Sequence, residues 1–483
     1  MSSAVARRRA VTLLALSIIL PGTAQVVAGN RALGRIVLRV WLGLLGLGLL
    51  IGLVAFVSVS TIVGLLSAPW FLTIAQWTLF AWAAVWAFVV IDAWRLGRPT
   101  SQPAHTRRRF AIATVVLMLV PATVAYAGAS VSSGRSALAA VFADGPALDS
   151  TDGRYNILLL GGDGGDDREG TRPDTIQLVS IDERSGRAVL FAFARDTEYI
   201  TFDEGSVMAG LMPEGWNCGH ECLLNGIYTW AWDHEDEFPE GTENPGLLAT
   251  RGAVEALSGL DVHYHVIVDL DGFRDVIDAL GGLEINVARR TPIGGIGSQI
   301  SGWIEPGAQH LDGQHALWYA RSRVGSTNYE RMARQRCVIT AMAQQIDPVS
   351  VAARFGSLAS STAGVLETDF PQSELGRFAD LALKTKSQKI SSVSFVPPLM
   401  KPWNYEPEFV RDTVAQTIEA SEDLEEDEAT VAPVTPAPSA GASDEPTSTA
   451  DTPTEADPGA GLERPGEDEN AQTDDAAQVC SVG

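Results

Sequence analysis

The pattern of hydrophobic and polar residues divides the chain into unlike segments. Residues 1–130 are mostly apolar, whereas residues 155–420 alternate between apolar and polar positions as globular domains do. A juxtamembrane linker is expected at 131–154, and residues 421–483 contain few large apolar side chains. Single cores stop growing near about 250–300 residues, so a chain of 483 residues is expected to hold a domain with long appendages.

Three apolar stretches in the first segment are long enough to cross a bilayer as helices, which takes about 20 residues. They cover residues 37–66, 70–91 and 110–129. An earlier apolar stretch at 11–28 is interrupted by Pro21–Gly22, so it is predicted to form either a re-entrant hairpin or a fourth span. The first segment therefore predicts a multi-pass anchor in the cell membrane.

Arginines flank these spans unevenly, and basic loops stay on the cytoplasmic side of a membrane. Arginines gather before and at the start of the first span, and again between the second and third, whereas the turn Ser67–Pro69 carries no charge. This distribution predicts a cytoplasmic N-terminus, three crossings and an extracytoplasmic C-terminal domain. A cleavable signal peptide is the weaker alternative, because no clear small-residue cleavage site follows Ala28.

The second segment, residues 155–420, predicts a mixed α/β core. A buried strand at Tyr155–Gly161 ends in a glycine-rich loop. Strands at Thr175–Ile181 and Ala188–Phe193 are separated by a turn typical of a hairpin. Helical and strand patterns then alternate along the chain, so we expect helices that cover a sheet rather than a pure β sandwich.

Charge separates the tail from the rest of the chain. The formal net charge is −24, and the tail at 421–483 is rich in carboxylates, Pro, Thr, Ala and Ser. Such a segment cannot bury enough apolar surface to offset the entropy lost on ordering, so it is predicted to be disordered. No contiguous basic face is visible along the sequence, which argues against nucleic acid binding.

Arginines and aspartates nevertheless gather at the ends of apolar runs in the second segment. Guanidinium groups match phosphate oxygens in a bidentate geometry, and carboxylates among them are suitable ligands for Mg2+. The pattern therefore predicts a pyrophosphate site, although a helix that begins near Arg331 could by itself carry ordinary surface arginines. The candidate residues are Asp163, Arg168, Arg172, Asp174, Arg195, Asp196, Arg321, Arg323, Arg331 and Arg334.

The four cysteines suit an oxidising compartment. Cys218 and Cys222 flank a short loop in which a disulfide is plausible. Cys337 and Cys480 could form a second bridge that ties the end of the tail to the domain. A zinc site that recruits a neighbouring histidine is the alternative, but the spacing is poor and there is no second close cysteine pair.

A series of short motifs runs from about Tyr155 to Asp347. The motifs are Asn156–Asp163, Arg172–Thr175, Arg195–Thr197, Asn225–Gly226, Asp271–Phe273, Asp278–Gly282, Leu311–Gly313, Ala316–Arg323 and Arg331–Gln335. Each motif is short, but their order and number closely resemble the LytR-CpsA-Psr (LCP) family. The resemblance implies an LCP-type α/β/α fold with a central mixed sheet and a hydrophobic tunnel for a lipid.

The same resemblance implies a membrane-anchored phosphotransferase of the cell wall. Such an enzyme moves a glycopolymer from a polyprenyl-pyrophosphate carrier to a hydroxyl group of peptidoglycan, forming a phosphodiester. Its partners are the carrier-linked glycopolymer, peptidoglycan and the lipid bilayer. A polyprenyl-pyrophosphate phosphatase and a non-catalytic anchored regulator that binds polyprenyl phosphates are the alternatives.

The resemblance also implies roles for individual residues. Asp163 and Asp174 match Mg2+ ligands and, with Arg195, form the catalytic set. Asp196 could accept a proton from the incoming hydroxyl, but a structural role is favoured because an aspartate beside an arginine is a poor base. The pyrophosphate contacts match Arg172, Arg195, Arg321, Arg323, Arg331 and Gln335, with Arg168 and Arg334 as helpers.

Three positions depart from the family pattern. Asn328 stands where the family commonly has aspartate, which removes a negative charge near Arg331. Ala194 replaces the usual proline before Arg195, and the loop at 164–170 is unusually acidic. These departures bear on the fine geometry of the site and on the choice of acceptor.

Overall fold

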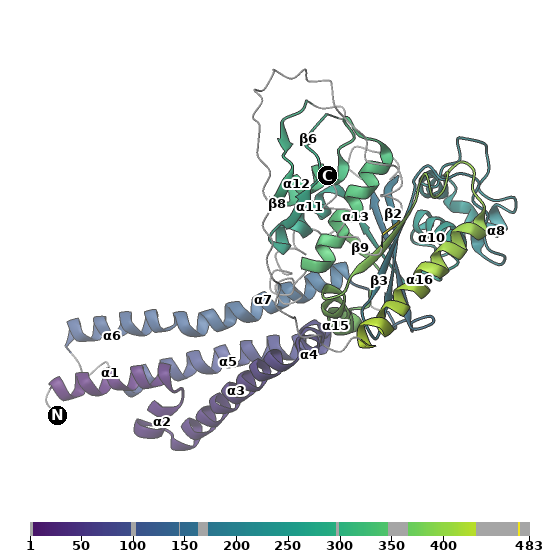
Figure 1. Cartoon of the computed structure of the whole chain (residues 1–483). Helices are drawn as coiled ribbons and strands as arrows, with labels where there is room; N and C mark the ends of the chain where they lie inside the picture. The colour runs from purple at the N-terminus through teal and green to yellow at the C-terminus, as the bar shows by residue number, and fades with distance from the viewer. Residues whose placement is uncertain are drawn as a thin grey trace, which may run out of the picture. The chain divides into compact units, whose positions relative to one another are not determined.

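The chain divides into two compact units in the computed structural model shown in Figure 1. Unit 1 comprises Met1–Asp149 and Ile346–Leu383, and unit 2 comprises Ser150–Gln345 and Lys384–Gly483. The structure describes residues 3–97, 103–143, 145–162, 172–295, 299–345, 366–430 and 472–473.

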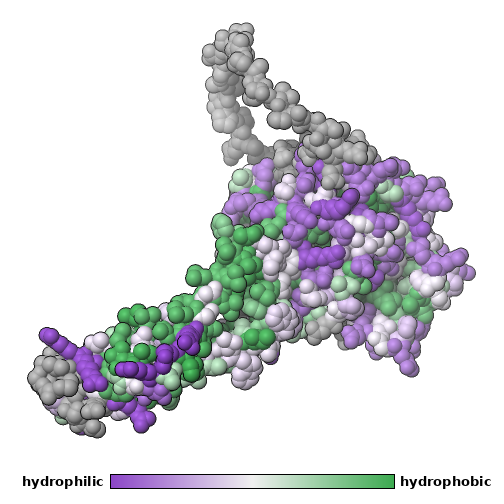
Figure 2. All heavy atoms as spheres, turned by 90° about the horizontal axis from the view of Figure 1, so that it is seen from below, coloured by the Kyte–Doolittle hydropathy of each residue, from purple (hydrophilic) through white to green (hydrophobic). Residues whose placement is uncertain are grey.

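Unit 1 is mainly helical. Among its described residues, three helical segments are long and apolar enough to span a membrane, which confirms the three predicted apolar spans and indicates membrane anchoring. Figure 2 shows mostly hydrophobic side chains along these helices, whereas much of the surface of unit 2 is hydrophilic. The orientation of the anchor stays a prediction. The helices of unit 1 are α1 (Ser3–Ile19), α2 (Thr23–Ala28), α3 (Arg31–Val57), α4 (Val59–Ser67), α5 (Pro69–Leu96), α6 (Ala104–Leu117) and α7 (Leu119–Val141).

The first span differs from its predicted bounds of 37–66 at both ends. It begins six residues earlier because the side chain of Asn30 caps α3 and accepts hydrogen bonds from the backbone N–H groups of its first turn. It stops at Ser58, whose backbone is extended and whose hydroxyl caps the next helix by accepting from Thr61 N. The predicted single helix is therefore two helices, α3 and α4.

The stretch predicted at 11–28 forms a helical hairpin. Gly22 at its turn has a φ of +95°, and a Cβ there would lie 2.5 Å from the carbonyl oxygen of Gly34, so a side chain is excluded on both grounds. Neither α1, with 17 residues, nor α2, with 6, reaches the length of about 20 residues that a bilayer requires. Whether this hairpin is re-entrant or a fourth span stays a prediction.

Unit 2 is built on a mixed sheet, as predicted. Its strands are β1 (Arg154–Gly162), β2 (Pro173–Asp182), β3 (Ala188–Phe193), β4 (Tyr264–Val268), β10 (Ile390–Phe395) and β11 (Gln472–Thr473). Their order in unit 2 is β11-β10-β3-β2-β1-β4, in which β1 and β4 pair in parallel, as do β3 and β10, and the other pairs are antiparallel. The predicted hairpin is the β2–β3 pair.

Helices cover both faces of this sheet, because side chains alternate between the two faces of each strand. In β3, Val189, Phe191 and Phe193 join the main core with residues of α9 (Gly226–Asp233), α10 (Pro245–Ser258) and α16 (Pro407–Thr430). Ala188 and Leu190 pack instead with Ile339 and Ala343 of α13 (Asn328–Gln345). Figure 1 shows α13 and α16 on either side of the strands. The layers are therefore α/β/α.

The remaining elements are helices that cover the sheet and short strands that belong to a smaller, second hydrophobic core. The helices of unit 2 are α8 (Val207–Leu211), α9 (Gly226–Asp233), α10 (Pro245–Ser258), α11 (Leu270–Leu280), α12 (Gly313–Arg321), α13 (Asn328–Gln345) and α16 (Pro407–Thr430), with a short 3-10 turn, η2 (Glu235–Glu237). Two small hairpins, β5 (Leu283–Val287) with β8 (Gly307–Leu311) and β6 (Thr291–Ile293) with β7 (Gly302–Ile304), pack with α11 to α13. Unit 1 also holds β9 (Leu366–Thr368) and η3 (Gln372–Glu374), and α15 (Leu375–Lys386) crosses the boundary between the units.

The tail begins later than its predicted start at residue 421. Helix α16 continues to Thr430, and Glu422 on it forms an ion pair of 3.2 Å with the buried Arg154 at the start of β1. Apart from the end of α16 and the short strand β11, the predicted disordered segment lies outside the described residues.

The ends of β1, β3 and β10 and the start of β2 lie along one edge of the sheet. Gly162 at the end of β1 faces Pro173 at the start of β2, and Ile176 of β2 faces Phe193 at the end of β3. Phe193 in turn faces Phe395 at the end of β10. Loops that leave these strands therefore meet at a single edge, which is where ligands commonly bind in open α/β sheets.

Candidate functional site

Asp174, at the start of β2, is the centre of an ion-pair cluster at this edge. Arg195, which follows β3, forms an ion pair with one carboxylate oxygen of Asp174. Arg331, in the first turn of α13, lies 3.4 Å from the other oxygen and donates to the backbone carbonyl of Asp174 at 3.2 Å. The structure thus brings together three predicted site residues that come from three different elements.

Arg331 is a buried cation with spare hydrogen-bonding capacity. Its side chain is 2% exposed, and its Nε has no hydrogen-bond partner among the described residues. Burial lowers the pKa of Arg331 to about 10, and the charges of Arg195, Arg323 and Arg334 act in the same direction, against the charge of Asp174. The guanidinium stays charged at neutral pH, and a cluster of like charges around one carboxylate is suited to a multivalent anion.

Asn328 connects Arg331 to Asp196. Its side-chain oxygen accepts from Arg331 at 2.8 Å, and its amide nitrogen donates to Asp196 Oδ1 at 3.3 Å. Asp196 therefore meets a neutral amide here, whereas the sequence favoured an arginine as its partner. Tyr329 lies close by, and burial followed by the charge of Asp196 raises the pKa of its phenol to about 12. The departure of Asn328 from the family pattern was the only sequence signal for this bridge.

Arg334 acts as a structural support for the loop that carries two other candidates. Its guanidinium donates to the backbone carbonyls of Tyr319 and Ser322 and lies 3.3 Å from the Ser326 hydroxyl. Burial lowers the pKa of Arg334, but the backbone carbonyls satisfy its donors. These contacts fix the end of α12, which carries Arg321, and the segment that follows it, which carries Arg323.

The other predicted site residues come from the segment before β2, from the end of α12 and the loop after it, and from α13. Arg321 lies at the end of α12 with its guanidinium 5.8 Å from the ring of Trp318. Arg172 and Arg323 are exposed, and Gln335 is buried one turn after Arg331. Asp163 and Arg168 lie outside the described residues.

The predicted Mg2+ site is represented by Asp174 among the described residues. A carboxylate is a suitable ligand for a hard cation, but in this arrangement both oxygens of Asp174 face guanidinium groups. No cluster of three or more His, Cys, Asp or Glu residues suited to a metal occurs within the described part of the chain. The participation of Asp163 and Asp174 in metal binding therefore stays a prediction.

A disulfide joins Cys218 and Cys222, the close pair singled out from the sequence. The segment after it is bonded to the site loop, because Leu224 N donates to the Thr197 carbonyl at 2.8 Å and Asn225 N donates to the Arg195 carbonyl at 3.0 Å. The bridge thus stabilises the backbone that carries Arg195. Cys337 is also disulfide-bonded, and its predicted partner Cys480 lies outside the described residues.

The fold and the site together define an α/β protein with apolar helices suited to a membrane and a cluster of arginines and carboxylates at one edge of its sheet. The chain belongs to the LytR_cpsA_psr family, whose model matches residues 126–406. This match confirms the family resemblance drawn from the motifs.

Named relatives match nearly half of the chain. An Enterococcus faecalis protein named polyisoprenyl-teichoic acid–peptidoglycan teichoic acid transferase TagU is 24% identical over 229 residues, covering 47% of this chain and 64% of the relative. An Oceanobacillus iheyensis protein of the same name is 27% identical over 222 residues, covering 46% and 60%. The chain thus spans less than two thirds of the length of these relatives. The crystal structure of Bacillus subtilis TagV aligns with a TM-score of 0.40 and 20% identity, covering 57% of this chain and 99% of that one.

Proposed function

We propose that the protein is a membrane-anchored phosphotransferase that moves a cell-wall glycopolymer from a polyprenyl-pyrophosphate carrier to peptidoglycan. The observation that carries this proposal is the cluster of Asp174, Arg195 and Arg331, in which a buried guanidinium has a donor that meets no partner in the described part of the chain. Family membership and the names of the relatives support it, since those relatives are named as teichoic acid transferases.

The proposed reaction exchanges one bond at phosphorus for another. A peptidoglycan hydroxyl attacks the phosphorus that bears the glycopolymer, the bond to the bridging oxygen breaks, and polyprenyl phosphate leaves with the electron pair. The hydroxyl proton passes to a base or to the leaving phosphate. Catalysis of such a transfer consists mainly of positioning and charge stabilisation.

The residues of the cluster have distinct tasks in this reaction. Asp174 orients the guanidinium groups of Arg195 and Arg331, which then bind phosphate oxygens and stabilise charge as it moves to the bridging oxygen. Asp196 lies within the same network through Asn328 and is the candidate carboxylate for accepting the proton. The predicted Mg2+, held by Asp163 and Asp174, would neutralise pyrophosphate charge when bound.

The anchor supports the choice of substrate. A polyprenyl chain resides in the bilayer, and unit 1 contributes three apolar helices that are suited to a bilayer. A tethered domain meets such a carrier within the membrane plane rather than by diffusion from bulk solution. The tunnel that would hold the lipid chain stays a prediction.

A transfer assay tests the proposal. Full-length protein in lipid vesicles with Mg2+, a polyprenyl-pyrophosphate-linked glycopolymer and peptidoglycan should yield polymer bound to peptidoglycan and free polyprenyl phosphate. Arg195→Ala should lower the rate by about 100-fold or more, because one preorganised charge contact to the transition state is lost. Arg290→Ala is the matched control, since Arg290 is an exposed arginine of the same unit that pairs with Glu305.

The products distinguish the competing functions. Polymer released as a free phosphate would mean that water is the acceptor and that the protein is a pyrophosphatase. Carrier binding without any cleavage would indicate a non-catalytic regulator. Equal rates for the wild type and Arg195→Ala would rule out the assigned site.

A further inference from the structure

Aromatic side chains lie on the loop that follows Arg195 and on two segments that contact this loop. Tyr199 is 39% exposed and Trp403 is 46% exposed, although large aromatic residues are usually buried. The ring of His220 lies beside that of Tyr199, and 80% of the His220 side chain is exposed. We call Tyr199, His220 and Trp403, together with the partly buried Tyr405, the aromatic patch.

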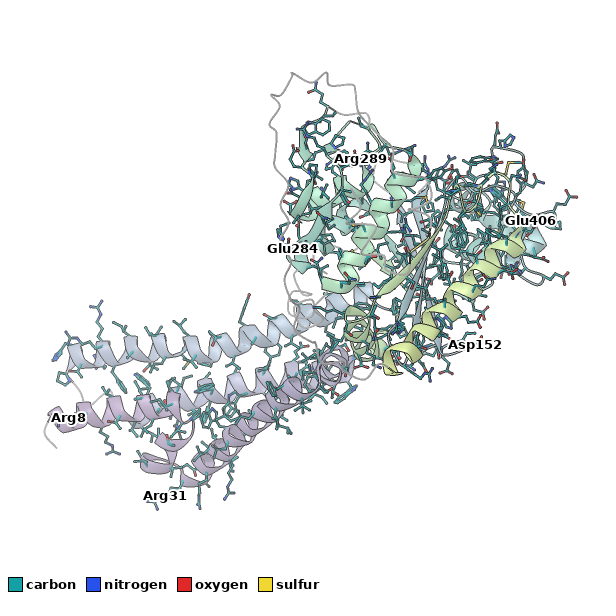
Figure 3. All side chains as sticks on the ribbon, viewed as in Figure 1. Arg8, Arg31, Asp152, Glu284, Arg289 and Glu406 are labelled. Atoms are coloured by element: carbon teal, nitrogen blue, oxygen red, sulfur yellow. A yellow bond between two sulfur atoms is a disulfide. The ribbon has the colours of Figure 1, made fainter. Side chains whose placement is uncertain are left out.

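Backbone contacts hold the patch together. Glu198 N donates to the Pro402 carbonyl at 2.9 Å, which joins the loop after β3 to the loop after β10. Tyr405 Oη lies 3.5 Å from the Tyr199 carbonyl oxygen. The rings of Tyr199 and His220 have centroids 6.5 Å apart and cross at 76°. Figure 3 shows the next residue, Glu406, by the start of α16.

Tyr199 has a backbone conformation that tyrosine rarely adopts. Its φ is +54°, in the left-handed region that favours glycine. A bulky residue at such an angle is an outlier, and outliers of this kind concentrate at functional sites. This turn exposes an aromatic ring to solvent, although asparagine or glycine would adopt the same backbone angle at a lower cost. We therefore expect the ring to have a function.

Polar groups with fixed positions border the rings. His220 Nδ1 lies 2.8 Å from Glu198 Oε2, whose side chain is only 9% exposed, and the flanking disulfide limits the freedom of His220. A pyranose ring has an apolar C–H face that stacks on aromatic rings and hydroxyl groups that need hydrogen-bond partners. Exposed aromatic rings beside oriented polar groups match both requirements.

The patch lies next to the proposed reaction centre. Tyr199 follows Arg195 by four residues, so their Cα atoms are at most about 14 Å apart. The loop that bears His220 leads into Asn225, whose N–H donates to the Arg195 carbonyl. A saccharide bound on the patch would therefore place neighbouring sugar hydroxyls close to the arginine cluster.

We propose that the aromatic patch binds the glycan strand of the peptidoglycan acceptor. The choice of the acceptor rests on the proposed function: the donor is a membrane lipid, whereas the acceptor is a wall polymer that reaches an open surface from solvent. Trp403 and Tyr199 supply the stacking faces, and the pair of His220 and Glu198 supplies hydrogen bonds to the amide and hydroxyl groups of the amino sugars.

Calorimetric titration tests the proposal without any turnover. The probe is a soluble tetrasaccharide of alternating N-acetylglucosamine and N-acetylmuramic acid, added to the full-length protein in detergent without donor or metal. Trp403→Ala should weaken binding by about tenfold, and Trp403→Phe by only about threefold because a stacking face remains. Trp232→Ala is the matched control, since Trp232 is a 39% exposed tryptophan on α9.

A second variant guards against misfolding. Tyr199→Asn keeps a residue that tolerates the left-handed backbone but removes the ring, so it should also weaken binding while the melting temperature is unchanged or higher. Wild-type affinity in both Trp403→Ala and Tyr199→Asn, or no binding by the wild type, would overturn the proposal. Loss of carrier-linked glycopolymer binding with unchanged tetrasaccharide binding would assign the patch to the donor and would overturn the acceptor assignment. Because no transfer is measured, failure of the proposed function leaves this result interpretable.

Discussion

At the scale of single residues, the site depends on contacts that burial makes costly to change. Arg331 is buried, yet among the residues that the structure describes it meets one carboxylate, one amide and one carbonyl, which leaves its Nε without an acceptor. Burying a charge is expensive unless it is paired, so the arrangement is retained at a cost to stability. This is expected of a residue that is selected for binding an anion.

His263 shows a second residue-scale constraint, at the start of β1. Both of its ring nitrogens lie 3.1 Å from backbone N–H groups, those of Thr151 and Asn156. A neutral imidazole accepts at one nitrogen and a protonated imidazole at none, so protonation removes an acceptor from a buried backbone donor. The neutral form is therefore the one that fits the fold.

The charge balance around His263 sets a pH dependence of stability. Burial lowers the pKa of His263 from its usual value of 6.5, and Arg251 adds to this shift, against Asp261 and Glu255. The unfolded chain binds the proton more tightly, so the stability that His263 contributes is full above about pH 6.5 and is lost as the pH falls through the folded pKa.

The corresponding prediction concerns the melting temperature of the full-length protein between pH 7 and pH 5. The wild type should lose stability across this window, and His263→Gln, which cannot take up a proton, should show a smaller decrease. His310→Gln is the control, because His310 is an exposed histidine that pairs with Glu284 on a peripheral strand. Parallel pH profiles for the wild type and His263→Gln would contradict this assignment.

At the scale of elements, the hairpin of α1 and α2 is fixed to α5 by a buried polar side chain. Gln25 is fully buried, and its amide donates to the Val89 carbonyl and to Asp92 Oδ2, each at 3.1 Å. Few other groups could satisfy those acceptors in an apolar surrounding. The contact explains why a polar residue interrupts the apolar stretch at 11–28.

Gln25→Leu should therefore loosen the hairpin, at a cost of about 1–3 kcal/mol for the lost hydrogen bonds. Ala24 is fully buried beside it, so a reporter cysteine in Ala24→Cys should react slowly with a membrane-permeant maleimide. The reaction should be faster when Gln25→Leu is added, with Gln25→Glu as a variant that keeps the shape but not the donor. Equal labelling rates in Ala24→Cys alone and with Gln25→Leu would show that the contact does not hold the hairpin.

Short-range patterns predicted the elements whose stabilising contacts are local. The β2–β3 hairpin follows from alternation and a turn signal, and the apolar helices follow from length and hydrophobicity. The break at Ser58 was missed because the apolar run continues through it, and the cap is a single side chain. The extension of α16 to Thr430 was missed because an acidic composition hides its helical continuation.

At the scale of the whole molecule, the motifs identified the candidate site residues but did not predict which of them lie close together in the fold. Asp174 and Arg331 are separated by most of unit 2 in sequence and meet only because β2 starts where α13 begins. The bridge through Asn328 and the contact of the Trp403 loop with the Tyr199 loop depend on long-range packing, which no local pattern encodes. The motifs that hold the candidate residues were therefore predictable from the sequence, and the geometry that joins them was not.

In the proposed enzyme, the helices of unit 1 anchor the protein and unit 2 carries out the reaction. Unit 1 offers apolar helices suited to a bilayer, and unit 2 offers a polar surface with the arginine cluster and the aromatic patch. Donor and acceptor are both polymers in the proposed reaction, so tethering one of them in the membrane and capturing the other on a surface reduces the entropy cost of their encounter.

The most direct test of the central claim is whether the cluster binds a diphosphate. Calorimetric titration of the full-length protein with inorganic pyrophosphate and Mg2+ should show binding, and Arg331→Lys should weaken it by about tenfold or more, because the charge is kept but the guanidinium fork is lost. Arg290→Lys should bind as the wild type does. Equal affinities for the wild type and Arg331→Lys, or no binding at all, would contradict the account.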